Sequence, residues 1–417
     1  MPDPLHIAFV SMHTSPADLP GSGDAGGMNV VEYHQAFALA RLGHGVDLIT
    51  RRSDPAQPDV VELSDAVRLI HLPAGPPERL AKSLIDAHIG EFAAGLTGLS
   101  AGYDVLHSHH WMSGVAALPV ARLREVPHIQ SFHSVAALPG SALSEGEPPE
   151  SPARVPGERL VASESDAVIA ISAAEARTVV ERCGADPDRV MIVPPGVDRT
   201  IFHAEAPTPS VERAQTTGLL AELVETPEST PSTNPRGYLL YAARLQPLKG
   251  PDLAIKALAE VPAELRPDLL IAGDVSADFA AYEADLHALV DAQGLGDAVH
   301  FIGPQPREQL AGLMRGARIV LVPSHSETFG LIALEAESCG TPVIASAAGG
   351  LREAVVHGET GQLMDSRQPE DWGTAITRLL AKPERLARMG VVAQIHARRF
   401  DWDWTARLLD LHYRELL

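Results

Sequence analysis

The sequence predicts an α/β protein with two domains, each built around a parallel β-sheet, and three observations support this. The chain has 417 residues, which is more than one ordinary hydrophobic core accommodates. Short apolar runs rich in β-branched residues alternate with amphipathic helical stretches, as in a parallel sheet with helices on both faces. This alternation occurs twice, on either side of a Pro- and Gly-containing break at Val193–Gly196.

The first predicted domain covers residues 1–195. Its expected strands are Leu5–Met12, Gly45–Arg52, Ala66–Pro73, Asp104–His109, Pro127–His133, Ala167–Ser172 and Arg189–Val193, with helices at Asn29–Leu42 and Ala174–Arg182. The segment 401–417 is amphipathic and predicts a C-terminal helix that closes onto this domain, with Trp402 and Trp404 as packing anchors. Residues 139–156 are rich in Ser, Glu and Pro and predict a long loop.

The second predicted domain covers residues 196–400 and repeats the scheme. Its expected strands are Tyr238–Ala243, Asp268–Gly273, Ala298–Gly303, Arg318–Pro323 and Pro342–Ala345. Its expected helices are Pro251–Glu260, Ala280–Gln293, Arg307–Arg315 and Leu331–Cys339. Residues 205–236 show little periodicity and are interpreted as an irregular surface excursion, apart from one short helix at Leu219–Val224.

Composition excludes several classes of protein. The 54 Asp and Glu residues outnumber the 33 Lys and Arg residues, and a net charge of −21 argues against nucleic-acid binding. No apolar run approaches the roughly 20 residues that span a bilayer, and no signal peptide is evident. Cys183 and Cys339 lack paired spacing, which favours a reducing cytoplasm and gives no support to a metal site. We expect no cofactor, and a homodimer is left open.

The strongest local signal runs from Pro323 to Glu335. A strand ends at Pro323, a polar loop containing Glu327 follows, and a helix begins near Gly330. A helix N-terminus offers free amides and the positive end of the helix dipole, which together suit a diphosphate. Glu327 and Glu335 are placed to hold hydroxyl groups of a sugar nucleotide. The alternative is that both are capping and surface residues.

Two further loops follow strands. Arg244 and Lys249, with Gly250, come after the first strand of the second half and could neutralise a leaving diphosphate; the alternative is a solvated basic loop. Gly26 and Gly27 belong to a Gly-rich loop after the first strand of the chain. That loop lacks the Gly-x-x-x-x-Gly-Lys-Ser/Thr pattern, so a P-loop ATPase is not indicated.

A histidine cluster, His107, His109 and His110, ends the strand Asp104–His109. We interpret it as a strand-end cluster that faces the predicted cleft and not as a metal site, although His107 and His109 share one face of the strand. His13, at the end of the first strand, is expected to face the same cleft, with a structural role as the alternative.

Taken together, the Glu327-x₇-Glu335 spacing, the upstream Arg244 and Lys249, and Gly26-Gly27 resemble the retaining family-4 glycosyltransferases of the GT-B fold. The likeness covers nearly the whole chain. The shared segments are Ser11–Pro16, Gly26–Val30, His107–His109 and Arg244–Pro247, which point to members that transfer N-acetylglucosamine from a uridine diphosphate donor to 1D-inositol 3-phosphate. The resemblance implies two Rossmann-like domains facing a central cleft.

The resemblance also implies a role for each matching residue. The catalytic and donor-binding residues are expected to be His133, Arg244, Lys249, Glu327, Gly27, Phe329, Gly330, Leu331, Glu335 and Gln305. Among them Arg244 and Lys249 would bind the diphosphate, Glu335 the ribose hydroxyls, and Glu327 and His133 the donor hexose. The acceptor-binding residues are expected to be Asn29, Lys82, His110, Ser134 and Arg154.

Three residues depart from the pattern of those members. His110 stands in place of a tyrosine, Ser134 in place of a threonine, and Gln305 in place of an arginine beside the nucleobase. A typical histidine gains charge below about pH 6.5, so we expect His110 to strengthen phosphate binding there. For Lys82 and Arg154 the alternative is that both are solvated residues of surface loops.

The family's usual chemistry is a same-face attack in which the leaving phosphate oxygen takes the acceptor proton, so retention at the anomeric carbon is expected. Domain closure about Pro194–Gly196 would exclude water. Two rival functions remain open: a related GT-B transferase acting on a specialised-metabolite or lipid-linked acceptor, and a catalytically inactive sugar-nucleotide-binding protein. His133, Arg244, Lys249, Glu327 and Glu335 are all present, which argues against the inactive protein.

Overall fold

The computed structural model describes residues 3–18, 20, 25–137, 151–204, 234–275 and 279–417. The chain divides into two compact units. Among the described residues, the first unit extends to Gly196 and also includes Phe400–Leu417, and the second extends from Val197 to Arg399. Most of the expected loop 139–156 and of the expected excursion 205–236, including its short helix, lies outside the described residues.

The first unit contains an eight-stranded sheet with the strand order β3-β4-β2-β1-β5-β6-β7-β8. The strands are β1 (His6–Ser11), β2 (Gly45–Arg51), β3 (Val60–Ser64), β4 (Val67–Leu72), β5 (Val105–His109), β6 (His128–Ser131), β7 (Ala167–Ala170) and β8 (Val190–Ile192). All neighbours pair in parallel except the edge strand β3, which is antiparallel to β4. The run from β4 to β7 has the 3-2-1-4-5-6 order of a Rossmann sheet.

The second unit contains a six-stranded parallel sheet with the same Rossmann order, β11-β10-β9-β12-β13-β14. The strands are β9 (Tyr238–Ala242), β10 (Asp268–Ala272), β11 (Val299–Phe301), β12 (Ile319–Val322), β13 (Val343–Ser346) and β14 (Gly361–Met364). The central strands β9, β10, β12 and β13 are buried throughout, as expected for a parallel sheet covered on both faces.

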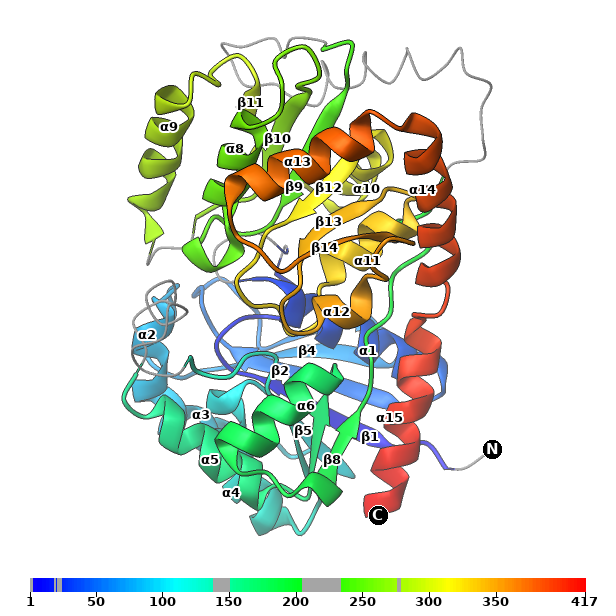
Figure 1. Cartoon of the computed structure of the whole chain (residues 1–417). Coiled ribbons are helices and arrows are strands. Elements are labelled where there is room, and N and C mark those ends of the chain that lie inside the picture. Colours follow the sequence, from blue (N-terminus) through cyan, green and yellow to red (C-terminus); the bar gives the residue numbers. More distant parts are fainter. Residues whose placement is uncertain (1–2, 19, 21–24, 138–150, 205–233, 276–278) are drawn as a thin grey trace. The chain divides into compact units, whose positions relative to one another are not determined.

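Helices connect the strands of each sheet (Figure 1). Those of the first unit are α1 (Gly27–Arg41), α2 (Lys82–Ile85), α3 (Ile89–Gly98), α4 (Trp111–Arg124), α5 (Arg154–Glu164), α6 (Ala173–Thr178) and α15 (Trp402–Leu416). Those of the second unit are α8 (Pro251–Ala259), α9 (Tyr282–Ala292), α10 (Arg307–Gly316), α11 (Leu331–Ser338), α12 (Leu351–Ala354), α13 (Pro369–Leu380) and α14 (Pro383–Ala397).

The C-terminal helix α15 joins the first unit although it comes last in the chain. It packs against α1, and the Trp402 indole stacks on the His34 ring with a centroid distance of 5.1 Å. The Tyr413 hydroxyl is fully buried and contacts His107 Nδ1 at 2.7 Å. Trp404, in contrast, is 53% exposed, so the prediction that it is a packing anchor is wrong. Its ring lies on the polar side of the helix, beside Arg407.

The structure corrects other details of the prediction. The segment 154–156, assigned to a loop, forms the first turn of α5, because Arg154 pairs with Glu158 one turn later. The edge strand β3 and the last strand β14 were not expected, and both have partly exposed residues that give no continuous apolar run. Among the described residues, none of the helices has the length and apolar character needed to cross a bilayer.

Candidate active site

Each sheet has a switch point where the strand order reverses, and ligands of Rossmann sheets bind beyond the carboxyl ends of the strands there. In the first unit this point lies between β1 and β5, and in the second between β9 and β12. The loops that leave these strands carry most of the predicted site residues. The predicted site residues therefore fall into two half-sites, one on each unit.

The second unit's half-site is built from the loops after β9 and β12. Lys249 Nζ lies 2.6 Å from Glu327 Oε1, and Ser324 Oγ donates to the same oxygen at 2.9 Å. Both charged side chains keep some exposure, 21% for Lys249 and 16% for Glu327. The structure therefore brings together Lys249, the predicted diphosphate cation, and Glu327, the predicted hexose ligand. Arg244 lies on the same loop as Lys249, shortly after β9 ends.

Two glycines let the backbone of these loops lie close to neighbouring groups. Gly250 has φ +68°, and a Cβ there would lie 2.3 Å from the carbonyl oxygen of Pro323. Gly330, the N-cap of α11, has φ +106°, and a Cβ there would lie 2.5 Å from a methyl group of Leu351. Only glycine suits both positions. At the start of α11, Ala333 already donates its amide to the Gly330 carbonyl oxygen at 3.0 Å, so Leu331 and Ile332 carry the amides that can serve an anion. Phe329 beside them is buried.

Glu335 is buried inside α11, 6% exposed, and its partner is Arg307 of α10, with Nη1 3.2 Å from Oε1. The interpretation of Glu335 as a surface residue is therefore wrong. Burial raises the pKa of Glu335, and the nearby guanidinium of Arg307 opposes this shift. The Arg307 guanidinium also lies over the Phe202 ring at 4.8 Å. Gln305 donates its amide to the carbonyl oxygen of Ile302 at 2.6 Å, which fixes its side chain beside the β11 end.

In the first unit, the Gly-rich loop leads into α1. Gly27 is exposed at the first position of this helix, with Gly26 as N-cap. Asn29 is buried and engaged: its Oδ1 accepts the Gly26 amide at 2.8 Å, and its Nδ2 donates to Thr14 Oγ1 and to the Ser15 carbonyl oxygen. Both of its N–H groups are committed, so Asn29 can offer an acceptor only a carbonyl lone pair.

The hydrogen bonds of His107 exclude it as a metal ligand. Ser131 Oγ donates to the carbonyl oxygen of Ile169, so it must accept from His107 Nε2 at 2.9 Å. His107 Nδ1 is then the acceptor for the Tyr413 hydroxyl. Burial lowers the pKa of His107 well below its usual value, which keeps the ring neutral.

His109 instead contacts His133. His109 Nδ1 lies 2.9 Å from His133 Nε2, and the rings stack with an interplanar angle of 19°. Glu32 of α1, which the sequence analysis did not consider, is fully buried with Oε1 3.8 Å from His109 Nδ1. One potential ligand atom from each of the three side chains lies within 4.8 Å of the others.

His133 itself has φ +57°, which is unusual for a residue with a side chain. Its backbone amide interacts with the buried carboxyl group of Glu175, which also accepts the Ile171 amide at 2.7 Å. Burial raises the pKa of Glu175 to about 7. Glu175 was not predicted, although Ser172-x-x-Glu175 has the spacing of a capping box.

His110 is buried, and the expected gain of charge near pH 6.5 is wrong. Burial is the main cause that holds the pKa of His110 well below its usual value, and the positive charges of Lys82 and Arg154 act in the same direction. His110 therefore stays neutral at physiological pH. Its ring packs against that of His13 in a tilted arrangement, with a centroid distance of 4.2 Å and an interplanar angle of 39°.

Lys82 and Arg154 are both near enough to His110 for their charges to help lower its pKa, with burial as the main cause. Lys82 opens α2 and is half-buried. Arg154 is 2% exposed, so the alternative of a solvated loop residue is wrong for it. Arg154 Nε donates to Glu158 Oε1 at 2.8 Å, and Nη2 donates to the exposed Ser134 hydroxyl at 3.3 Å.

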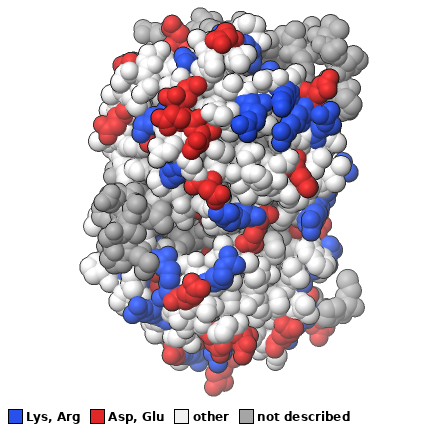
Figure 2. Space-filling model, in the orientation of Figure 1, with Lys and Arg blue, Asp and Glu red and all other residues white. Residues whose placement is uncertain are grey.

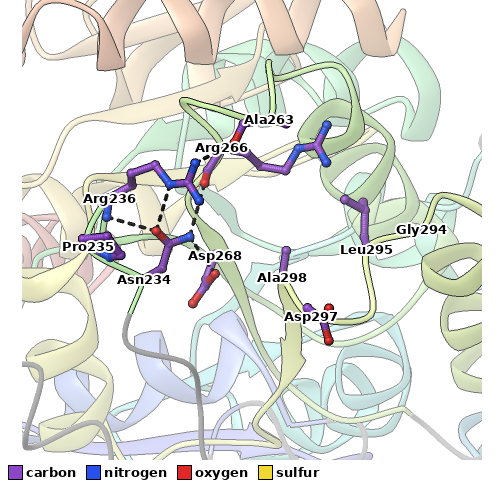
Figure 3. A pocket seen from close by; sticks show the side chains of 10 residues that line it. All are labelled: Asn234, Pro235, Arg236, Ala263, Arg266, Asp268, Gly294, Leu295, Asp297 and Ala298. Carbon is purple, nitrogen blue, oxygen red and sulfur yellow. Dashed lines mark hydrogen bonds between the residues drawn. The ribbon is translucent and has the colours of Figure 1, made fainter.

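A hollow of about 350 Å³ in the second unit is a different feature (Figure 3). It lies at the amino ends of β9 and β10, next to Arg236 and Asp268. Its two arginines, Arg236 and Arg266, are hydrogen-bonded to backbone carbonyl oxygens of Ala263 and Val261. Because ligands of these sheets bind at the opposite, carboxyl ends, we do not assign the hollow to the active site.

Comparison with known proteins identifies the class. Residues 26–196 match the model of the glycosyl transferase 4-like domain, and residues 225–395 match that of the glycosyl transferases group 1. The chain belongs to the retaining family-4 glycosyltransferases, which have the GT-B fold.

Among its relatives is the D-inositol 3-phosphate glycosyltransferase of Xylanimonas cellulosilytica, 41% identical over 97% of this chain and 96% of that protein. The enzyme of the same name from Thermomonospora curvata is 40% identical over 97% and 94% of the two chains.

Solved structures give the same fold. Sucrose-phosphate synthase from Thermosynechococcus elongatus superimposes with a TM-score of 0.87 at 29% identity, covering 99% of each chain. HepE from Anabaena, whose structure contains UDP and glucose, superimposes with a TM-score of 0.74 at 20% identity, covering 99% of this chain and 100% of that one.

Proposed function

We propose that this glycosyltransferase moves a hexosyl unit, N-acetylglucosamine or glucose, from a uridine diphosphate sugar to 1D-inositol 3-phosphate. The observation that carries the acceptor is the grouping of Lys82 and Arg154 around His110, with the Ser134 hydroxyl on Arg154. Two cations and a hydroxyl suit a phosphate monoester, which carries about −1.5 to −2 charge at neutral pH. The roughly 40% identity to D-inositol 3-phosphate glycosyltransferases supports the same acceptor.

The donor would bind to the second unit's half-site. Arg244, Lys249 and the first-turn amides of α11 would hold the diphosphate and stabilise the charge that develops as it leaves. Lys249 has three N–H donors, so it can bind phosphate while keeping its contact with Glu327. Glu335 would accept the ribose hydroxyls, with Arg307 favouring its ionised form.

The reaction would proceed on one face of the sugar. The acceptor hydroxyl forms the new bond to the anomeric carbon as the bond to the leaving phosphate oxygen breaks, and that oxygen takes the hydroxyl proton. Glu327 and His133 would position the hexose, and Gly27 would lie against the distal phosphate. These residues supply orientation and electrostatic stabilisation, and no enzyme nucleophile is needed.

A second candidate is a related transferase that uses a specialised-metabolite or lipid-linked acceptor. The observation that favours it is His110, which is neutral and buried beside the predicted phosphate site. A neutral ring adds no charge to phosphate recognition, so the two cations must supply all of it.

The test is a product screen. The purified protein is incubated with UDP-linked and other nucleoside diphosphate sugars against 1D-inositol 3-phosphate, inositol and neutral glycosyl acceptors, and products are identified by mass spectrometry and their anomeric configuration by NMR. We expect a retained glycosyl product from 1D-inositol 3-phosphate and far less from inositol. Efficient transfer to inositol or to another neutral acceptor would contradict the proposal.

A further inference from the structure

Tyr413 carries a buried hydroxyl group that the proposed reaction does not use. It lies on α15, the last helix of the chain, which packs against α1 of the first unit. The side chain is fully buried, and its hydroxyl contacts His107 Nδ1 at 2.7 Å, although the two residues are 306 positions apart. Burial raises the pKa of the Tyr413 hydroxyl well above its usual value, so the group keeps its proton. The hydroxyl is therefore available as a hydrogen-bond donor to a histidine of β5.

Two hydrogen bonds determine how the His107 ring faces. Ser131 Oγ gives its single proton to the Ile169 carbonyl oxygen, so His107 Nε2 carries a proton and donates to Ser131. The neutral ring then presents a bare Nδ1, to which the Tyr413 hydroxyl donates. Turning the ring over would place C–H groups against both hydroxyls. Because the outer torsion of a histidine side chain has a broad energy profile, these two bonds set the plane of the ring.

The plane of the His107 ring matters because His109 packs on it. The two side chains share one face of β5, and their rings stack with a centroid distance of 4.4 Å and an interplanar angle of 28°. Among the described residues, the His109 ring has one hydrogen-bonding contact, from Nδ1 to His133 Nε2 at 2.9 Å, and its Nε2 has none. One such contact does not fix the plane of a ring. Packing against His107, with Phe9 beside both rings, supplies the further constraint.

The stack ends at His133, the predicted ligand of the donor hexose. The rings of His109 and His133 stack with an interplanar angle of 19°, so the orientation set at His107 extends through His109 to His133. We propose that Tyr413 is a positioning residue whose hydroxyl, through the stacked rings of His107 and His109, orients His133 toward the donor hexose. The role of His133 in this inference rests on the proposed function. The last helix of the chain thereby contributes to the half-site of the first unit.

The first experiment is Tyr413→Phe, which removes the hydroxyl and keeps the ring. It leaves His107 Nδ1 buried without a donor, so the His107 ring can tilt about its contact with Ser131. With the donor and acceptor that the product screen identifies, we expect kcat to fall about tenfold, the equivalent of one ordinary hydrogen bond. The acceptor KM and the affinity for free UDP, which has no hexose, should stay unchanged. An unaltered kcat would overturn the proposal.

A double-mutant cycle separates positioning from a general loss of stability. His133→Ala removes the group through which Tyr413 is proposed to act, so adding Tyr413→Phe to His133→Ala should lower kcat little further. A general loss of stability would instead lower kcat by the same factor with and without His133. Equal factors in the two backgrounds would overturn the proposal.

Tyr238→Phe is the matched control. The Tyr238 hydroxyl is also buried and donates to one carbonyl oxygen, that of Leu313 at 2.7 Å, but it belongs to the second unit and lies at the amino end of β9. Tyr238→Phe should lower the melting temperature, as Tyr413→Phe does, and should leave kcat unchanged. An equal fall in kcat in both variants would overturn the proposal, because loss of any buried tyrosine hydroxyl would then explain it.

Nitrogen NMR of protein labelled with ¹⁵N-histidine tests the structural step without substrates, with single His→Asn variants to assign the signals. Wild-type His107 should be neutral and protonated on Nε2, and a proton on its Nδ1 would overturn the proposal. The ring signals of His109 and His133 should shift in Tyr413→Phe and stay in place in Tyr238→Phe. Unshifted signals in Tyr413→Phe would also overturn it. Because these spectra need no acceptor, failure of the product screen and failure of this inference remain distinguishable.

Discussion

The two half-sites hold their functional groups in opposite ways. The half-site of the first unit is rich in histidines that are buried and neutral, with His107, His109 and His110 all held well below their usual pKa by burial. The half-site of the second unit depends on charged side chains that remain partly exposed, among them Lys249 and Glu327. On the face shown in Figure 2, acidic and basic side chains are interspersed.

This difference corresponds to two kinds of work. Under the proposed function, departure of a diphosphate requires charges that are present before the reaction and need no reorganisation, and Lys249 and the α11 amides would provide them. Orientation of a sugar requires hydrogen bonds of fixed direction, which the buried neutral rings would provide. The comparison therefore predicts large electrostatic effects in the second unit and smaller effects of geometry and burial in the first.

The largest effect is expected at Lys249. Lys249→Ala should lower kcat by about 10²–10³, because it removes a preorganised donor worth roughly 3–4 kcal/mol in the transition state. Steady-state rates with saturating donor and acceptor measure this. Lys256→Ala is the matched control: Lys256 forms a partly exposed i,i+4 pair with Asp252 on α8 of the same unit and should have little effect. Equal rates for the two variants would remove Lys249 from the diphosphate site.

The sequence predicted those elements and residues whose signals are local. The long apolar strands, the helix after Gly330 and the cations after β9 all followed from periodicity and from turn residues next to strand ends. The family resemblance then supplied a role for each predicted site residue.

Residues whose surroundings depend on tertiary structure were not predicted. Glu32 lies near His109, and Arg307 pairs with Glu335. Both partners are distant in the sequence, so no local pattern predicts these pairs. His110 was predicted to titrate normally. The prediction failed because the fold buries His110 against His13, which no local sequence pattern shows. Trp404 shows the opposite error, since an aromatic residue beside a buried Trp402 turned out to face solvent.

A smaller effect is expected at Glu175, and it tests the claim that the first unit keeps its groups neutral. The pKa of Glu175 is about 7 in the folded protein, above its usual 4.5. Between pH 4.5 and 7 the unfolded chain therefore releases a proton that the folded protein retains. The stability contributed by Glu175 is therefore complete below about pH 4.5 and is lost as pH rises to about 7. The loss is on the order of 3–4 kcal/mol.

Urea unfolding of wild type and Glu175→Gln at several pH values measures this loss. The wild type should lose stability relative to the variant as pH rises through that window. Glu384→Gln on α14 is the control, because its side chain is 91% exposed. If the difference between wild type and Glu175→Gln does not change with pH, Glu175 is not a neutral buried acid.

The smallest effect is expected at Lys82, and it tests whether the acceptor substrate carries a phosphate. Charge reversal at Arg154 would be a poor test, because that residue is buried against Glu158 and its loss would leave an unpaired buried carboxylate costing about 3–5 kcal/mol of stability.

Lys82 is half-buried at the start of α2, so Lys82→Ala should leave the fold intact. The Lys82→Ala variant should raise the KM for 1D-inositol 3-phosphate about tenfold, as expected for one charge-assisted hydrogen bond, without changing the donor KM. Arg79→Ala, an exposed cation three residues earlier, is the matched control and should change neither constant. With unphosphorylated inositol, wild type and Lys82→Ala should perform alike, because the lost charge then has no phosphate to bind. A Lys82→Ala variant that uses 1D-inositol 3-phosphate as well as wild type would favour the alternative acceptors over the phosphate.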